Sequence, residues 1–312
     1  MADADLVLVT GAAGFIGSHL CDALLDAGYR VRAADSLAGG NAANLAAARA
    51  KQGFEFAQAD LADGASCRRV CAGVRHVLHH AALASVPVSI SDPLRCHRDT
   101  LDTTANLLAA AREAGAARFV LASTAAVYGR TPAAPVAESM PFDPQSPYAA
   151  SKAAGELYVQ AFARMGLDGV SLRYFNAYGP RQDPRSAYSG VISIMADRLR
   201  RNEPVTIYGD GGATRDFVHV SDIVAADLLA LAARQPLAGA ALNIGSGRAV
   251  TIREVAELIG RLLGRTPEIR LQPERPGDIR HSCADVSAAR RVLGFEARVG
   301  LADGLRDLLG QA

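Results

Sequence analysis

Residues 6–17 place a short apolar run directly before three spaced glycines, in Leu6-Val7-Leu8-Val9-Thr10-Gly11-Ala12-Ala13-Gly14-Phe15-Ile16-Gly17. The run predicts a buried strand, and the Ala- and Leu-rich residues 16–27 predict a helix. Glycines between a strand and a helix permit a tight turn and let the backbone approach a pyrophosphate at the helix N-terminus. A glycine turn that only packs the helix on the strand would have the same spacing.

Asp35 stands 18 residues after Gly17, at the end of the next strand-like run. A carboxylate there can accept hydrogen bonds from an adenosine ribose and would repel a 2′-phosphate. With the strand, glycines, helix and acid in this order, the sequence predicts a dinucleotide site that prefers NAD to NADP.

Short strand-like runs alternate with helical runs through the first half of the chain, which predicts a parallel sheet covered on both faces. We expect an α/β fold of the Rossmann type, doubly wound, with a smaller, irregular α/β C-terminal domain. The first domain should comprise residues 1–176 and about 216–245, and the second about 177–215 and 246–312. The strands are expected at 6–10, 30–34, 54–59, 76–81, 118–122, 170–175 and 241–245, with helices at 16–27, 103–114, 149–164 and 221–234.

The net charge of +1 argues against a polyanion-binding surface, so we expect no nucleic-acid partner. No apolar run is long enough for a membrane span, and the acidic residues 1–5 do not resemble a signal peptide, so a cytoplasmic location is expected. Five scattered cysteines do not predict a disulfide framework. A metal site at Cys67 and Cys71 with the nearby histidines is disfavoured. His79 and His80 are neighbours in a strand-like run, and neighbouring side chains in a strand face opposite ways.

Tyr148 stands four residues before Lys152, so the two share one face of a helix. A cation beside a phenol favours the phenolate, which makes the pair a candidate for proton transfer. Ser123 and Thr124 end the fifth expected strand, and ligands collect at the carboxyl ends of parallel strands. At the third and fourth strand ends, Asp60-Leu61 would reach an adenine or cap the next helix, and Ala81-Ala82 would let the backbone pass close to a cofactor.

Nearly the whole chain resembles the extended short-chain dehydrogenase/reductases, specifically nucleotide-sugar epimerases and dehydratases. The resemblance rests on the motifs above and on Val127-Tyr128-Gly129, residues 173–180, Gly209-Asp210-Gly211, Arg215-Asp216-Phe217 and Arg275-Pro276-Gly277-Asp278. It implies that Tyr148 is the acid/base, that Lys152 lowers its pKa and holds the nicotinamide ribose, and that Thr124 and Ser123 orient the sugar hydroxyl.

The resemblance also implies the two sets of binding residues. The cofactor set is Gly11, Gly14, Phe15, Ile16, Gly17, Asp35, Asp60, Leu61, Ala81, Ala82, Thr100, Tyr148, Lys152 and Tyr174, where Thr100 replaces the asparagine common in the family. The substrate set is Ser85, Ser123, Thr124, Tyr148, Asn176, Val191, Arg215, Arg248, Arg275, Asp278 and Ser282. A plainer interpretation of Arg215, Arg248 and Arg275 is solvated loop charge, and of Ser282 an uninvolved loop hydroxyl.

Ala125 and Ala126 narrow the reaction, because dehydratases resemble a pattern with an Asp-Glu pair there and decarboxylases one with Glu at the second position. Alanine transfers no proton, which argues against dehydration and decarboxylation. The reaction left is oxidation and reduction of the sugar without further chemistry, as in an NAD-dependent 4-epimerase. The small Ser282 and the segments 76–87, 187–188 and 277–282 are similar to epimerases of UDP-N-acetylhexosamines, with UDP-glucose/UDP-galactose as the alternative. The resemblance further implies a homodimer through the helices at 103–114 and 149–164. Two alternatives to an epimerase stay open, namely another nucleotide-sugar oxidoreductase and a catalytically silent NAD-binding sensor.

Overall fold

The structure is a computed structural model, and it describes residues 4–130, 135–184, 190–274 and 280–311. Its centre is a parallel seven-stranded sheet in the order β10-β6-β5-β4-β1-β2-β3. These strands are β1 (Leu6–Thr10), β2 (Arg30–Asp35), β3 (Phe54–Gln58), β4 (His76–His79), β5 (Arg118–Thr124), β6 (Gly169–Tyr174) and β10 (Ala240–Ile244). The strand order reverses between β1 and β4, which is where doubly wound sheets bind ligands.

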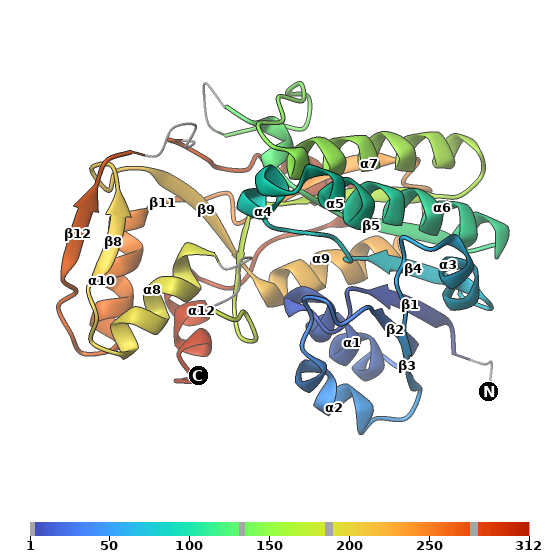
Figure 1. Cartoon of the computed structure of the whole chain (residues 1–312), viewed down its shortest axis with the longest axis horizontal. Helices are drawn as coiled ribbons and strands as arrows, with labels where there is room; N and C mark the ends of the chain where they lie inside the picture. Colours follow the sequence, from blue (N-terminus) through green and yellow to red (C-terminus); the bar gives the residue numbers. More distant parts are fainter. Residues whose placement is uncertain (1–3, 131–134, 185–189, 275–279, 312) are drawn as a thin grey trace.

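Helices cover both faces of this sheet (Figure 1). One side carries α3 (Gly64–Cys71), α4 (Val86–Ser91), α5 (Pro93–His97), the π-helical turn η2 (Arg98–Asp102), α6 (Thr103–Glu113) and α7 (Pro147–Arg164). The other side carries α1 (Phe15–Asp26), α2 (Ala46–Arg49), α9 (Val220–Ala232) and α11 (Ser287–Leu293). Alternate residues of β1 serve the two cores, since Val7 and Val9 join the α1 side while Leu6 and Leu8 join the α6 side. The predicted doubly wound α/β fold is confirmed.

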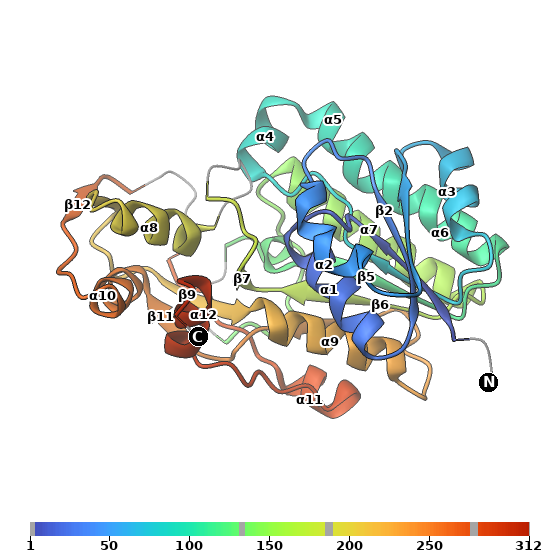
Figure 2. The same cartoon turned by 90° about the horizontal axis from the view of Figure 1, so that it is seen from below.

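The second lobe lies beyond the carboxyl ends of the strands (Figures 1 and 2). It contains the three-stranded sheet β11-β9-β7 and the pair β12-β8. Its strands are β7 (Asn176–Tyr178), β8 (Val205–Tyr208), β9 (Thr214–His219), β11 (Ala249–Thr251) and β12 (Ile269–Gln272), and its helices are α8 (Val191–Arg200), α10 (Ile252–Leu262) and α12 (Leu301–Leu308). Ile192, Val205, Ile207 and Val255 help to form a separate core there.

Two details differ from the expected domain division. β9 starts the stretch expected to return to the first domain, yet it pairs with β7 and β11 of the second lobe. In the opposite sense, α11 lies within the stretch expected in the second domain, yet Ala289 and Leu293 pack into the first core. The chain therefore crosses between the two lobes twice more than the sequence suggested, to α11 and then back to α12.

All five cysteines are buried and unpaired. In the parts of the chain that the structure describes, no helix is both long and apolar enough to cross a membrane.

Candidate functional site

A cavity of about 830 Å³ opens at the carboxyl ends of β1 to β5. It gathers nearly all the residues predicted to bind the cofactor: Gly11, Gly14, Phe15, Ile16, Gly17, Asp35, Asp60, Leu61, Ala81, Ala82, Tyr148, Lys152 and Tyr174. Residues from six parts of the sequence thus meet at the reversal of strand order. The volume is in the range of small-molecule and cofactor sites.

The glycine turn can form only because it lacks side chains. A Cβ on Gly17 would collide with the Gly11 carbonyl oxygen, and one on Gly11 would lie 2.8 Å from the Ala81 nitrogen. Gly11 also has φ of 63°, a conformation that favours glycine. Gly14, the N-cap of α1, provides no capping side chain, so the first amides of that helix remain for an anion. The turn therefore fits a dinucleotide.

Asp35 ties the turn to β2 from the wall of the cavity. Its carboxylate accepts hydrogen bonds from the Ala13 amide at 2.9 Å and the Leu37 amide at 2.8 Å. A Cβ on Gly40 would lie 3.0 Å from both carboxylate oxygens, so the loop after β2 fits tightly over the acid. The negative charge is thus fixed at the place where the ribose of NAD was expected and where a 2′-phosphate would be repelled.

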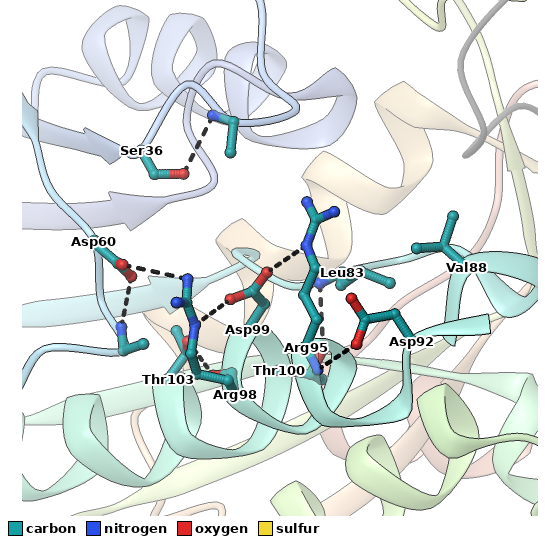
Figure 3. Close-up of polar contacts among 12 residues, drawn as sticks. Ser36, Asp60, Leu83, Val88, Asp92, Arg95, Arg98, Asp99, Thr100 and Thr103 are labelled. Carbon is teal, nitrogen blue, oxygen red and sulfur yellow. Dashed lines mark hydrogen bonds and ion pairs between the residues drawn. The ribbon is translucent and has the colours of Figure 1, made fainter. Parts of the chain in front are cut away.

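Asp60 does not cap the helix that follows it, so that interpretation was wrong. One carboxylate oxygen accepts the Ala62 amide at 3.0 Å, while α3 is capped by Asp63. The other oxygen lies 3.4 Å from the Arg98 guanidinium across the cavity mouth, as Figure 3 shows. The Asp60 carboxylate is therefore held by the turn and by the ion pair, at the end of the cavity where the adenine was expected.

Thr100 is the predicted cofactor contact that does not line the cavity. It is buried in η2, and its hydroxyl accepts the Leu83 amide at 3.2 Å (Figure 3). Leu83 does line the cavity. Thr100 thus supports the cavity wall from behind, because its side chain is shorter than the asparagine that it replaces.

The start of α7 places the expected proton-transfer pair. Ser146 caps the helix by accepting the Ala149 amide, and Pro147 occupies the first turn. Lys152, which is 3% exposed, donates to the Ala122 carbonyl at 2.7 Å. Burial lowers the pKa of Lys152 to about 8 and raises the pKa of Tyr148 to about 12. The expected lowering of the Tyr148 pKa is therefore not found here, since burial outweighs it.

Ser123 and Thr124 have different hydrogen-bond partners although they are neighbours. Ser123, nearly fully buried, donates to the Glu156 carboxylate. The Thr124 hydroxyl oxygen accepts the Ala126 amide at 3.1 Å, and a hydrogen bond between Thr124 and Tyr148 counteracts part of the rise in the Tyr148 pKa. Of the two hydroxyls, Thr124 is the one coupled to the phenol.

Four predicted substrate residues meet at the sheet of the second lobe rather than in this cavity. Asn176 in β7 donates to the Asp216 carbonyl at 2.9 Å, and Arg215 lies in β9. Arg248 precedes β11, and the Ser282 amide donates to the Thr214 carbonyl at 3.2 Å.

The other predicted substrate residues have separate places. Ser85 caps α4 by accepting the Val88 amide at 3.3 Å, and Val191 begins α8. Arg275 and Asp278, like Ala187 and Tyr188, lie outside the described residues.

The sequence did not single out several residues of the cavity wall. Arg95, Arg98 and Asp99 form ion pairs with one another and with Asp60 at the mouth of the cavity (Figure 3). Charges on an exposed helical face carry no signal of such a role. Ser36, residues 38–41, Asn44, His80, Leu83, Ala84, Thr103 and residues 181–183 also line the cavity.

Comparison with known proteins agrees with this geometry. Residues 7–245 match the model of the NAD dependent epimerase/dehydratase family. The UDP-glucose 4-epimerase of Mycolicibacterium smegmatis is 40% identical over 96% of this chain and 95% of its own. A UDP-N-acetylglucosamine 4-epimerase from Methanobrevibacter ruminantium, solved with UDP-N-acetylmuramic acid, is 37% identical with a TM-score of 0.93, covering 100% of this chain and 98% of its own.

A third relative was solved with the cofactor. The UDP-glucose 4-epimerase of Thermus thermophilus in complex with NAD is 39% identical with a TM-score of 0.88, over 98% of each chain. The glycine turn, the fixed Asp35 and the cavity between them account for the shared cofactor in physical terms, and the prediction of NAD is confirmed. This chain belongs to the NAD dependent epimerase/dehydratase family.

Proposed function

We propose that the protein epimerises C4 of a UDP-hexose, most specifically UDP-GlcNAc/UDP-GalNAc, through a transient 4-keto sugar. The observation that carries this proposal is the set Tyr148, Lys152 and Thr124 beside the cofactor cavity, with Ala125 and Ala126 as their neighbours. This set can move one proton at one hydroxyl. Elimination of water needs a second acid and base, which the two alanines cannot supply.

The proton step follows from the hydrogen bonds of Thr124. Its oxygen accepts the Ala126 amide with one lone pair, which leaves a second lone pair for the sugar O4–H and its own hydrogen for Tyr148. Tyr148, as phenolate, takes the O4 proton, and it returns the proton once the sugar has turned. The chemistry that NAD supplies when bound is uptake and return of the hydride at C4.

The residues that would hold the cofactor are the turn from Gly11 to Gly17, Asp35, Asp60 and Lys152. Protonated Lys152 has a second task, because a phenol whose pKa burial raises to about 12 needs a nearby cation to ionise. The pKa of about 8 keeps Lys152 charged at neutral pH and lets it lose its proton in mild alkali.

The first test is turnover on UDP-GlcNAc and UDP-Glc. We expect UDP-GalNAc from the first and weaker formation of UDP-Gal from the second, whereas a silent NAD-binding sensor would form neither. Tyr148→Phe should lower turnover by about 10²–10⁴-fold and retain bound NAD, because the phenol acts on the sugar proton. Near-normal turnover of this variant would contradict the role of Tyr148.

Ser282 supports the acetamido substrate. It is 9% exposed, and its amide is fixed against Thr214 next to Arg215. A small side chain there leaves room for a 2-acetamido group, so Ser282→Tyr should lower kcat/KM for UDP-GlcNAc by at least about tenfold relative to UDP-Glc. Equal losses on both substrates, in a side-by-side assay, would leave Ser282 without a role in this choice.

We also propose that two copies associate through α6 and α7. Leu157 and Tyr158 are neighbours on α7 and are 53% and 43% exposed, so they offer apolar surface that a second copy can cover. Sedimentation of the purified chain should give the mass of a dimer.

A further inference from the structure

The helix that carries Tyr148 and Lys152 continues their face with a third ionisable residue, Glu156. The spacing of four residues, repeated, stacks the three side chains on successive turns of α7. Glu156 is 0% exposed. A buried carboxylate is costly unless it is paired and hydrogen-bonded, so its partners define what it does.

Both carboxylate oxygens of Glu156 are occupied. Arg173 in β6, with a side chain that is 4% exposed, contacts them in fork geometry at 3.0, 3.0 and 2.7 Å. The Ser123 hydroxyl donates to Oε1 of Glu156. These partners are all hydrogen-bond donors, and Arg173 is a cation, so the buried carboxylate is fully paired.

Arg173 is itself held rigidly. Its guanidinium carbon lies 4.9 Å from the centre of the Tyr128 ring and 5.1 Å from that of Phe142, and it donates to the Tyr128 hydroxyl at 2.8 Å. The Tyr128 hydroxyl donates in turn to Asn243 in β10 at 2.6 Å. The carboxylate of Glu156 is thus anchored to β5, β6 and β10, and it cannot swing away from α7.

The other titratable groups near Lys152 supply no negative charge at neutral pH. They are His79 from β4, Cys96 from α5 and Tyr148 from its own helix. Burial keeps the His79 imidazole neutral by lowering its pKa, and it raises the pKa of the Cys96 thiol. Against the effect of burial, the negative charge of Glu156 favours the ammonium form of Lys152 and so raises its pKa.

We propose that Glu156, fixed by Arg173 and Ser123, is a positioning residue that keeps Lys152 protonated beside Tyr148. The inference rests on the proposed function for its consequence, since charged Lys152 is what favours the Tyr148 phenolate. It also assigns Ser123 to this network, because the hydrogen of Ser123 is already donated to Glu156. Thr124 is then the hydroxyl that meets the sugar.

The composition of the chain permits a direct test. Lys51 and Lys152 are the two lysines of the sequence, so lysine-selective ¹⁵N and ¹³C labelling gives two side-chain signals. In the NAD-loaded protein, we expect Lys152 to titrate below the usual range of a lysine, because its side chain is buried. In Glu156→Gln, which keeps the shape and removes the charge, the midpoint should fall by about one pH unit or more. Lys51, whose side chain is 34% exposed and paired with Asp26, is the internal reference and should not differ between the variants.

Two further variants keep the test decisive. Glu156→Asp retains the charge and should restore most of the shift. Glu156→Gln leaves Arg173 buried without its partner, which can prevent folding. The double variant Glu156→Gln, Arg173→Met removes both charges, and it should fold while still lowering the Lys152 midpoint. Identical Lys152 midpoints in the native protein and a folded charge-free variant would overturn the inference.

The pH profile of turnover separates this inference from the proposed function. If the native protein epimerises a UDP-hexose, the alkaline limb of its kcat profile should move to lower pH in Glu156→Gln by the same amount as the Lys152 midpoint. A shifted titration without any epimerisation by the native protein would retain the positioning role and refute the proposed reaction. An unshifted Lys152 titration in an enzyme that epimerises a UDP-hexose would retain the proposed reaction and refute the positioning role of Glu156.

Discussion

The hydrogen bonds of His79 determine which of its two ring nitrogens carries the proton. Thr10 accepts the His80 and Ala81 amides, each at 3.2 Å, so its hydrogen is left to donate to Nδ1 of His79 at 2.7 Å. Thr104 gives its own hydrogen to the Thr100 carbonyl at 2.7 Å, so it accepts from Nε2 of His79 at 3.1 Å. His79 is therefore a neutral Nε2–H tautomer that joins the ends of β1 and β4 below the cofactor cavity.

This histidine should make the fold sensitive to mild acid. Burial holds the pKa of His79 well below 6.5, whereas in the unfolded chain it is about 6.5. Below pH 6.5 the unfolded state therefore binds more protons, and the free energy of unfolding should fall by up to about 1.4 kcal/mol per pH unit for this group. Urea unfolding at pH 7.5, 6.5 and 5.5 measures the slope.

His79→Gln is the matched variant, because a glutamine amide can accept from Thr10 and donate to Thr104 without titrating. It should be less stable at pH 7.5 and lose less stability between pH 6.5 and 5.5. His19, His76 and His219, whose pKa values burial also lowers, account for the slope that remains. An unchanged slope in the variant would show that His79 takes up its proton in the native state.

At the scale of elements, the sequence was most informative where signals are local. The strand, glycine turn and helix at residues 6–26 lie where they were predicted, since periodicity and glycines act within a few residues. The fifth strand was expected at 118–122 with Ser123 and Thr124 at its end, and β5 includes both of these residues. The helix expected from residue 149 begins at Pro147, because the Ser146-Pro147 start signal outweighs the apolar pattern used to place it.

The elements that could not be predicted depend on distant partners. β7 and β11 have three residues each, and the residues of their common partner β9 with which they pair lie 33 to 41 residues away along the chain. Strands this short have no periodicity to read. α11 packs on the first core although its sequence neighbours belong to the second lobe, since burial of Ala289 and Leu293 is decided by shape.

The candidate site divides in the same way. The glycines, Asp35, Tyr148 and Lys152 were found because turn geometry and helical spacing link them within short segments. The pairs Glu156–Arg173 and Asp60–Arg98 were missed as pairs, because 17 and 38 residues separate their members and only the folded sheet brings them together. Charge complementarity over such separations has many solutions in a chain of 33 basic and 32 acidic residues.

On the scale of the whole molecule, one segment connects the two lobes across the cofactor cavity. After β7 the chain runs from the second lobe to α1, the helix that begins at the glycine turn, and Arg181, Gln182 and Asp183 line the cavity. His19 of α1 contacts the Pro180 carbonyl at 3.0 Å, and Arg181 contacts Asp22 at 2.7 Å. Arg181 has φ of 65°, which costs about 1–3 kcal/mol outside glycine, so the surrounding contacts hold this segment in place.

This connection should retain the cofactor. Residues 181–183 line the same cavity as the glycine turn, so weakening the contact that fixes Arg181 to α1 should speed NAD release more than it changes the fold. The ion pair is partly exposed and contributes about 1 kcal/mol, which corresponds to about a fivefold faster release in Arg181→Ala. The decay of bound cofactor after dilution into NAD-free buffer measures the rate. Arg290→Ala is the control variant. It breaks the exposed ion pair between Arg290 of α11 and Glu296, and neither residue lines the cavity, so this variant should release NAD at the native rate. Equal rates in all three proteins would mean that the glycine turn and Asp35 retain the cofactor without this segment.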